Sequence, residues 1–198
     1  WAFQSSGITS ITIPRTVTTI HSYAFDSCSD LMIVEFEAYS QLLTIGSAAF
    51  LSIGITSITI PSTVSLIDNR AFSGCNNLQN VIFEADSQLH TIGHAAFVNI
   101  GITSITIPST VSLIDTNAFE GCSQLEYVSF SSDSNSNIDN GGMTLGGYLF
   151  DGCINLQSIF IPSTVTEIDG SAFTNSNANG FTVYIDDSNA YLPDTDTK

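Results

Sequence analysis

One stretch of this chain occurs twice without a single change, and that repetition constrains the fold more than any other feature. Residues Gly54–Asp68 recur as Gly101–Asp115, 47 positions further along, and a third copy with small differences begins at Gly7. Repetition at this period is typical of a solenoid, in which each unit buries its apolar side by stacking on the next one. The sequence therefore predicts an elongated stack of similar coils.

Each 47-residue block divides into two similar halves, and each half carries a phenylalanine followed by an apolar triplet. The triplet occupies relative positions 0, 3 and 5, as in Ile55, Ile58 and Ile60, and a second apolar pair such as Val64 and Ile67 follows it. Residues two apart face the same side of a strand, so we expect one coil per half and one parallel sheet built from successive coils. The repeat phenylalanines are Phe3, Phe25, Phe50, Phe72, Phe97, Phe119, Phe150 and Phe173.

A family resemblance is carried by strings such as Ile-Pro-Ser-Thr-Val-Ser-Leu-Ile-Asp-Asn-Arg-Ala-Phe-Ser-Gly-Cys-Asn-Asn-Leu, at residues 60–78. The string resembles the leucine-rich repeats of the BspA-like type, and similar strings cover about residues 1–185. The resemblance implies a repeat solenoid of about eight coils, wound as a right-handed superhelix. One parallel β-sheet would line its concave face, and short turns or helical segments its convex face. Residues 186–198 are then expected to form a C-terminal cap or tail.

One slot departs from the usual pattern of this family. Leucine-rich repeats commonly place Asn or Cys after the strand, where the side chain bonds backbone groups. A Thr hydroxyl can take over part of that role, because it also donates a hydrogen bond. The slot holds Thr16, Thr63, Thr110 and Thr164, or Asp86 and Asp133.

The composition argues against nucleic-acid and membrane partners. The chain has 3 Lys and Arg residues against 19 Asp and Glu residues, with a formal net charge of −16. It therefore has few cations with which to neutralise phosphates, and its charge disfavours anionic membranes. No run of about 18 apolar residues is present to insert into a bilayer. The chain opens at Trp1 without a basic leader, so we expect a mature chain or an excised piece.

The four cysteines each lie three residues after a repeat phenylalanine, which predicts small buried side chains. Cys28, Cys75 and Cys122 lie two coils apart, about 10 Å, which is too far for a disulfide. Cys122 and Cys153 lie on adjacent coils and are the one pair that could form a bridge. The chain has no Cys-x-x-Cys pair, and we expect no zinc site.

An insertion lengthens one coil, because Phe119 and Phe150 are 31 residues apart and the extra residues fall within 131–142. Side chains with oxygen atoms at alternate positions suit Ca²⁺. Ile138 stands where a calcium-binding loop has Gly, so a polar loop without a metal is the preferred interpretation. The candidate calcium ligands are Asp133, Asn135, Asn137 and Asp139.

No pattern in the sequence predicts catalysis or a cofactor. The chain lacks a Gly-x-Ser-x-Gly motif and a glycine loop that could hold phosphate, and no Cys and His occupy related repeat positions. Repeat proteins diversify on their surfaces and rarely build a preorganised pocket. We therefore expect a protein that is not an enzyme.

The residues that alternate with the buried triplet are expected to cover the outer face of the sheet. Aromatic residues concentrate at these positions in the last three coils, and exposed aromatic side chains often anchor interfaces. The alternative is that these rings pack against one another or against a further coil. The predicted partner-binding residues are Tyr127, Phe160, Phe181 and Tyr184.

The family resemblance implies a non-enzymatic module for protein binding or adhesion in a secreted or cell-surface protein. Its location would be extracellular or at the cell surface, and its partner a protein or a surface glycan. A second hypothesis is a structural element that associates with itself end to end in a larger polypeptide or an extracellular assembly. This hypothesis rests on the first coil, which begins within a repeat and has no polar cap before it.

Overall fold

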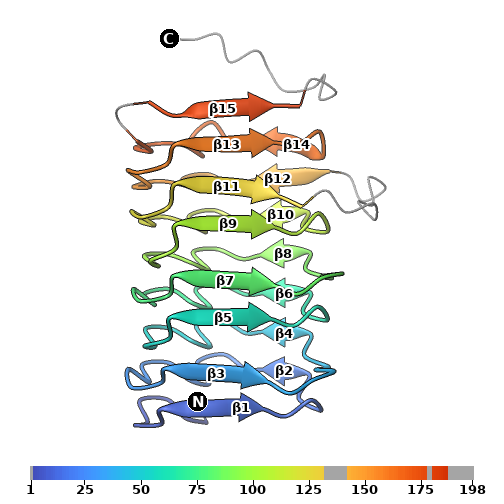
Figure 1. Cartoon of the computed structure of the whole chain (residues 1–198), viewed down its shortest axis with the longest axis vertical. Coiled ribbons are helices and arrows are strands. Elements are labelled where there is room, and N and C mark those ends of the chain that lie inside the picture. The colour runs from blue at the N-terminus through green and yellow to red at the C-terminus, as the bar shows by residue number, and fades with distance from the viewer. Residues whose placement is uncertain (1, 132–141, 178–179, 187–198) are drawn as a thin grey trace.

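The computed structural model describes residues 2–131, 142–177 and 180–186. They form a column of stacked coils with strands along a front side and a back side (Figure 1). The front strands are β1 (Ser10–Ile13), β3 (Ile33–Phe36), β5 (Ser57–Ile60), β7 (Asn80–Phe83), β9 (Ser104–Ile107), β11 (Tyr127–Phe130), β13 (Ser158–Ile161) and β15 (Thr182–Ile185). The back strands are β2 (Thr19–Ile20), β4 (Thr44–Ile45), β6 (Leu66–Ile67), β8 (Thr91–Ile92), β10 (Leu113–Ile114), β12 (Met143–Leu145) and β14 (Val165–Ile168).

The predicted solenoid of parallel strands is confirmed, but the prediction of a single sheet is wrong. The back strands form a 7-stranded parallel sheet of their own, in the order β14-β12-β10-β8-β6-β4-β2. Their signal in the sequence is the second apolar pair of each half, which includes the fully buried Ile67 and Ile92. Most of these strands are only two residues long, so they lack the alternation by which a strand is recognised.

The turns between the front and back strands are not helical. No helix occurs among the described residues, so the helical segments that the resemblance allowed are not observed. The turn that carries Phe72 contains two residues with positive φ, Arg70 (57°) and Gly74 (73°), and the next turn repeats this at Ala95 and Asn99. A left-handed backbone residue every few positions prevents a right-handed helix from continuing.

The repeat phenylalanines stack into one column along the core. Phe72 and Phe97 are fully buried, and their ring centroids lie 5.4 Å apart with only 2° between the ring planes. The same arrangement runs from Phe3 to Phe173, with centroid separations between 5.2 and 5.8 Å. The prediction that Phe72 and Phe97 share one buried column in adjacent coils is confirmed.

The cysteines form a second buried column beside the phenylalanines. Each thiol donates to a backbone carbonyl of the preceding coil, as Cys75 does to Phe50 (3.1 Å) and Cys122 to Phe97 (3.2 Å). All four thiols are free and fully buried, and this includes Cys153, which could have formed a bridge with Cys122.

Threonine side chains bond backbone groups at the turn after the strand. The hydroxyl of Thr63 donates to the carbonyl of Leu42 (2.7 Å), and that of Thr110 donates to the carbonyl of Leu89 (2.8 Å). Each hydroxyl thus links its own coil to the preceding one. Threonine at this slot performs the backbone-bonding role that Asn or Cys has in other leucine-rich repeats.

The front strands do not form one continuous sheet. Among the described strands, β1 pairs with β3 and β5 with β7, whereas β9, β11, β13 and β15 form a sheet of four. The ladder is missing between β3 and β5 and between β7 and β9, and Figure 1 shows these neighbours more widely separated than the paired strands.

Each interruption follows a strand that ends in Phe where other strands end in Ile. Phe36 ends β3, Phe83 ends β7, and Phe130 ends β11, whose pairing with β13 covers only Tyr127 and Val128. Strands that end in Ile, such as β5 and β9, pair with the next strand along their full length. The three Phe side chains are partly buried against the core. Because a Phe ring is larger than an Ile side chain, it holds the next strand away at this position.

Candidate binding face

Alternate residues of the front strands point away from the core and form a surface that we call the front face. In β9, Ser104 and Thr106 are exposed, whereas Ile105 and Ile107 are buried. The alternation predicted from the sequence is therefore confirmed for this strand. The outward residues of successive front strands are Ser10 and Thr12, Ile33 and Glu35, Ser57 and Thr59, Asn80 and Ile82, Ser104 and Thr106, Tyr127 and Ser129, Ser158 and Phe160, and Thr182 and Tyr184.

The part of the front face nearest the N-terminus is mainly polar. Strands β1, β5 and β9 present only Ser and Thr, while β3 and β7 each add one exposed isoleucine, Ile33 and Ile82. Ile33 pairs in register with Ser10, and Ile82 pairs with Thr59. Each isoleucine thus has a hydroxyl-bearing neighbour, and single exposed apolar residues of this kind are ordinary on protein surfaces.

The aromatic residues lie together over the last three front strands. Tyr127 is 48% exposed, Phe160 47% and Tyr184 56%, and we call these three residues the aromatic patch. Phe160 pairs in register with Tyr184, so the two rings project from directly opposed positions of neighbouring strands. Such cross-strand neighbours are close enough for their side chains to touch.

Tyr127 lies two residues out of register with this pair. Its register partner in β13 is Ser158, two residues before Phe160, so Tyr127 is a diagonal neighbour of Phe160 rather than a direct one. The hydroxyl of Tyr127 donates to the Gln157 side chain at 2.7 Å, which fixes the ring against β13. The patch is therefore a close pair with a third ring beside it, not a straight row.

Phe181 does not belong to the front face. It is partly buried and packs against the core, with its ring centroid 5.4 Å from that of Phe173 and the planes tilted by 42°. Phe181 thus extends the core column by one more ring. The sequence did not distinguish this position, because Phe181 precedes the strand by a single residue and lacks the spacing of the other repeat phenylalanines.

The inward positions of the last front strand are exposed as well. Val183 and Ile185 are 41% and 42% exposed, although they occupy slots that are buried in β13. β15 pairs only with β13 among the described strands, so the described residues place no strand along its other edge. Together with Tyr184 they make this strand the most apolar exposed segment of the front side.

The described residues contain no group of three or more His, Cys, Asp or Glu side chains that could hold a metal ion. The candidate calcium ligands Asp133, Asn135, Asn137 and Asp139 lie outside the described residues. The turn carboxylates have backbone partners instead, as Asp169 shows by accepting from Ser171. These hydrogen bonds lower the pKa of Asp169, because they stabilise its charged form.

Three of the cysteines are poorly suited to reaction, because burial keeps their thiols protonated. Burial raises the pKa of the Cys75 and Cys153 thiols to about 12, and it raises that of Cys122 well above its ordinary value. A thiol that stays protonated at neutral pH is a poor nucleophile and a poor metal ligand.

No helix among the described residues has the length and apolar character needed to cross a membrane.

A sequence profile of the BspA type leucine rich repeat region matches residues 1–126 and 126–193, with 6 copies. The chain belongs to the BspA-type leucine-rich repeat family. No curated protein matches this sequence. The family resemblance was carried by residues 60–78. In this BspA-type chain these residues include β6 and the turn after it that carries Phe72.

The fold of this BspA-type chain is similar to those of several solved leucine-rich repeat proteins. The Pneumococcal vaccine antigen PcpA matches with a TM-score of 0.67 and 22% identity, over 91% of this chain and 51% of that one. A leucine rich cell surface protein from Faecalibacterium prausnitzii matches with a TM-score of 0.53 and 27% identity, over 90% and 60%. A leucine-rich repeat protein from Eubacterium ventriosum matches with a TM-score of 0.56 and 21% identity, over 91% and 49%. The chain thus spans half to three-fifths of the length of these proteins.

Proposed function

We propose that the chain is a non-enzymatic binding module of a secreted or cell-surface protein, and that it binds a protein partner through the aromatic patch. Membership of the BspA-type family supports a binding or adhesion role. The similar protein from Faecalibacterium prausnitzii is a cell surface protein, which supports the location. The observation that carries the proposal is the gathering of three half-exposed rings on neighbouring strands of one face.

The chemistry of the patch favours a protein partner. Tyr127 and Tyr184 combine a large apolar ring with a hydroxyl, and side chains of this kind dominate the energetics of many protein interfaces. Phe160 lies between them and has no polar group of its own, so it gains most from being covered. The three rings lie at one end of the front face, whereas strands β1, β5 and β9 present only Ser and Thr, which offer little apolar area to bury.

The proposal is tested by measuring the binding of the chain to a panel of purified extracellular proteins, beside a matched panel of glycans. For any protein that binds, Phe160→Ser is expected to weaken affinity by about 2 kcal/mol or more and to leave thermal stability nearly unchanged. Thr59→Ala serves as the control, since it changes the same face far from the patch. Unchanged binding together with lost stability in Phe160→Ser would show that the rings are packing groups.

Two other results would redirect the proposal. Binding that depends on Thr59 and not on Phe160 would place the site at the opposite part of the front face. Binding to glycans alone would replace the protein partner by a carbohydrate one.

A second possible role for this chain is association with further copies of itself, end to end, and this role stays a prediction. Among the described strands β1 pairs only with β3, and Phe3 is 40% exposed at the end of the core column. An open strand edge and an exposed ring can both accept a further coil. Sedimentation over a wide range of concentrations tests this role, and a strict monomer would exclude it.

A further inference from the structure

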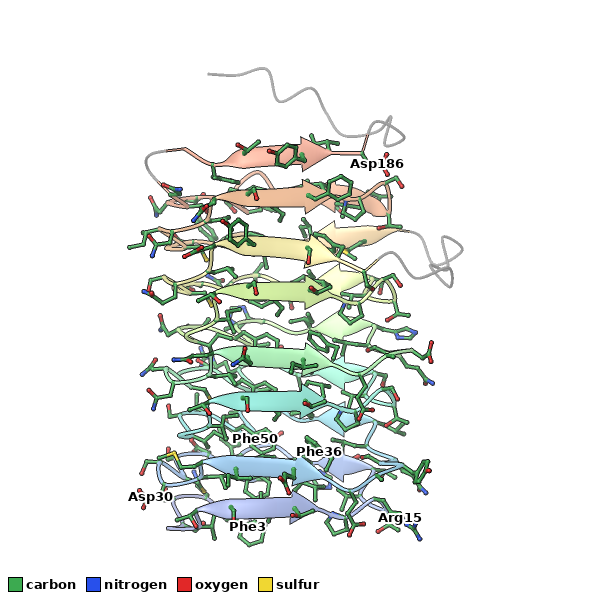
Figure 2. All side chains as sticks on the ribbon, in the orientation of Figure 1. Phe3, Arg15, Asp30, Phe36, Phe50 and Asp186 are labelled. Atoms are coloured by element: carbon green, nitrogen blue, oxygen red, sulfur yellow. The ribbon has the colours of Figure 1, made fainter. Side chains whose placement is uncertain are left out.

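Two shallow grooves cross the front face where the strand ladder is interrupted. Groove A lies between β3 and β5 and has a volume of about 550 Å³. Groove B lies between β7 and β9 and has a volume of about 500 Å³. The two grooves are equivalent under the 47-residue repeat, because each one follows a strand that ends in Phe, Phe36 in groove A and Phe83 in groove B. Figure 2 labels Phe36 beside the gap between β3 and β5.

The walls of the grooves contain backbone groups without a ladder partner. In a parallel strand, alternate residues direct both backbone groups toward the same neighbour. Glu84 donates its N–H to Ile60 of β5, so by alternation Val81 and Phe83 direct their backbone groups into groove B. No ladder joins β7 to β9 among the described strands. Backbone groups in this position take their hydrogen bonds from solvent or from a ligand.

The charge of the grooves is uniformly negative. Glu84 lines both grooves and Glu35 lines groove A, while no Lys, Arg or His is among the lining residues of either one. The two described arginines lie elsewhere, Arg15 in the turn after β1 and Arg70 in the turn that carries Phe72. One carboxylate oxygen of Glu84 accepts from the backbone N–H of Ser62, which holds the side chain at the groove. The described residues donate no hydrogen bond to its other oxygen.

We propose that grooves A and B receive basic side chains from an extended segment of a partner protein. Carboxylates and free backbone carbonyls are acceptors that suit the donors of Lys and Arg. The grooves are two coils apart, about 10 Å, so one extended segment laid along the front face reaches both. A metal ion is a poorer occupant, because the described residues bring no three metal-ligating side chains together here.

The inference rests on the proposed binding function but concerns a part of the front face away from the aromatic patch. It names the chemistry of a partner segment, a lysine- or arginine-bearing strand, that the patch alone does not specify. A partner that uses both regions would place apolar residues over β11 to β15 and basic residues over β3 to β9.

The test measures fluorescence anisotropy of a labelled Gly/Ser peptide that carries several lysines, with the matching glutamate peptide as a reference. The lysine peptide is expected to bind and the glutamate peptide not to. Glu84→Gln keeps the hydrogen bond to Ser62 and removes one charge, and it is expected to weaken the lysine peptide about two- to fivefold. Asp30→Asn is the matched control, because Asp30 is exposed in the turn before β3 and lines neither groove. We expect this control to change the affinity much less.

A second pair of variants tests the shape of the groove without changing any charge. Phe83→Ile is expected to let β9 approach β7, to close groove B and to lower the affinity for the lysine peptide. Phe130→Ile makes the same change outside both grooves and is expected to leave the affinity unchanged.

Equal losses in Glu84→Gln and Asp30→Asn would overturn the proposal, since they would show attraction to the overall charge only. Full affinity in Phe83→Ile, with hydrogen exchange showing that β9 has become protected, would also overturn it. If the amides of β9 still exchange rapidly in Phe83→Ile, groove B has not closed in that variant. The proposal is then decided by comparing the peptide affinities of Glu84→Gln and Asp30→Asn. Phe160→Ser is expected to leave peptide binding intact, so a failure of the aromatic patch and a failure of the grooves give different results.

Discussion

The rings of Phe72 and Phe97 lie parallel at 5.4 Å, although 25 residues of chain separate them. Each is fully buried and has a further ring on its other side, Phe50 beyond Phe72 and Phe119 beyond Phe97. Successive coils therefore contact one another through the same side chain, and a gap in this column would separate two coils at their centre.

Replacing Phe97 by Ala is expected to lower the free energy of unfolding by about 3–5 kcal/mol, because it leaves a cavity between two rings. Urea denaturation measures the loss. Phe3→Ala is the control, since Phe3 is 40% exposed and Phe25 is the one described ring on which it stacks, and its cost is expected to be clearly smaller. A loss below about 1 kcal/mol for Phe97→Ala would contradict the stacked column.

The threonine at the turn after β9 contributes to the contact between coils. Thr110→Val removes a hydroxyl that donates to the carbonyls of Leu89 (2.8 Å) and Ser87 (3.0 Å), and it is expected to cost about 1–3 kcal/mol. Thr106→Val is the matched control, because its hydroxyl is exposed on the front face and bonds only Ser129. Similar stabilities for the two variants would mean that the Thr110 hydroxyl does not contribute to the free energy of unfolding.

The buried thiols make stability depend on alkaline pH. The pKa of Cys75 is raised from 9.0 to about 12, so above pH 9 the unfolded chain loses this proton while the folded chain keeps it. The stabilising contribution of the protonated thiol is therefore fully present below pH 9. As the pH rises toward 12, the free energy of unfolding falls by about 1.4 kcal/mol per pH unit for each such thiol. Urea denaturation at a series of pH values measures the slope.

Cys75→Ser is the variant that isolates this effect. Serine already occupies the same slot in the last coil, where Ser176 donates to the carbonyl of Phe150 at 2.9 Å. The variant is expected to lose stability less steeply between pH 9 and 10 than the parent chain does. Identical slopes would show that Cys75 ionises as readily in the folded protein as in the unfolded one.

The interruption between β7 and β9 gives a prediction for backbone protection. Phe83→Ile is expected to extend the ladder to β9 and to slow amide hydrogen exchange at Ser104 and Thr106, whose backbone groups face β7. Exchange followed by mass spectrometry measures this, with Phe130→Ile as the control. Unchanged exchange in Phe83→Ile would mean that a feature other than the ring separates the two strands.

Much of this architecture could be predicted from the repeat alone. The spacing of the phenylalanines predicted the core column, and the alternation within strands such as β9 predicted which side chains face outward. The aromatic residues of the front face were also found in this way, because Tyr127, Phe160 and Tyr184 occupy outward slots of the triplet pattern. Phe181 was misplaced, because its local pattern does not distinguish the end of the core column from the start of a strand.

The sequence by itself determined the period of the solenoid, the inward and outward faces of its front strands and the absence of positive charge along them. These properties follow from the identity and order of residues within one coil. Only the tertiary structure decided how one coil meets the next, including the back sheet, the pairing of Phe160 with Tyr184 and the two grooves. Phe36 and Ile60 both count as apolar in a pattern, yet only the structure shows that the ladder is interrupted after the strand that ends in Phe36 and continues after the strand that ends in Ile60.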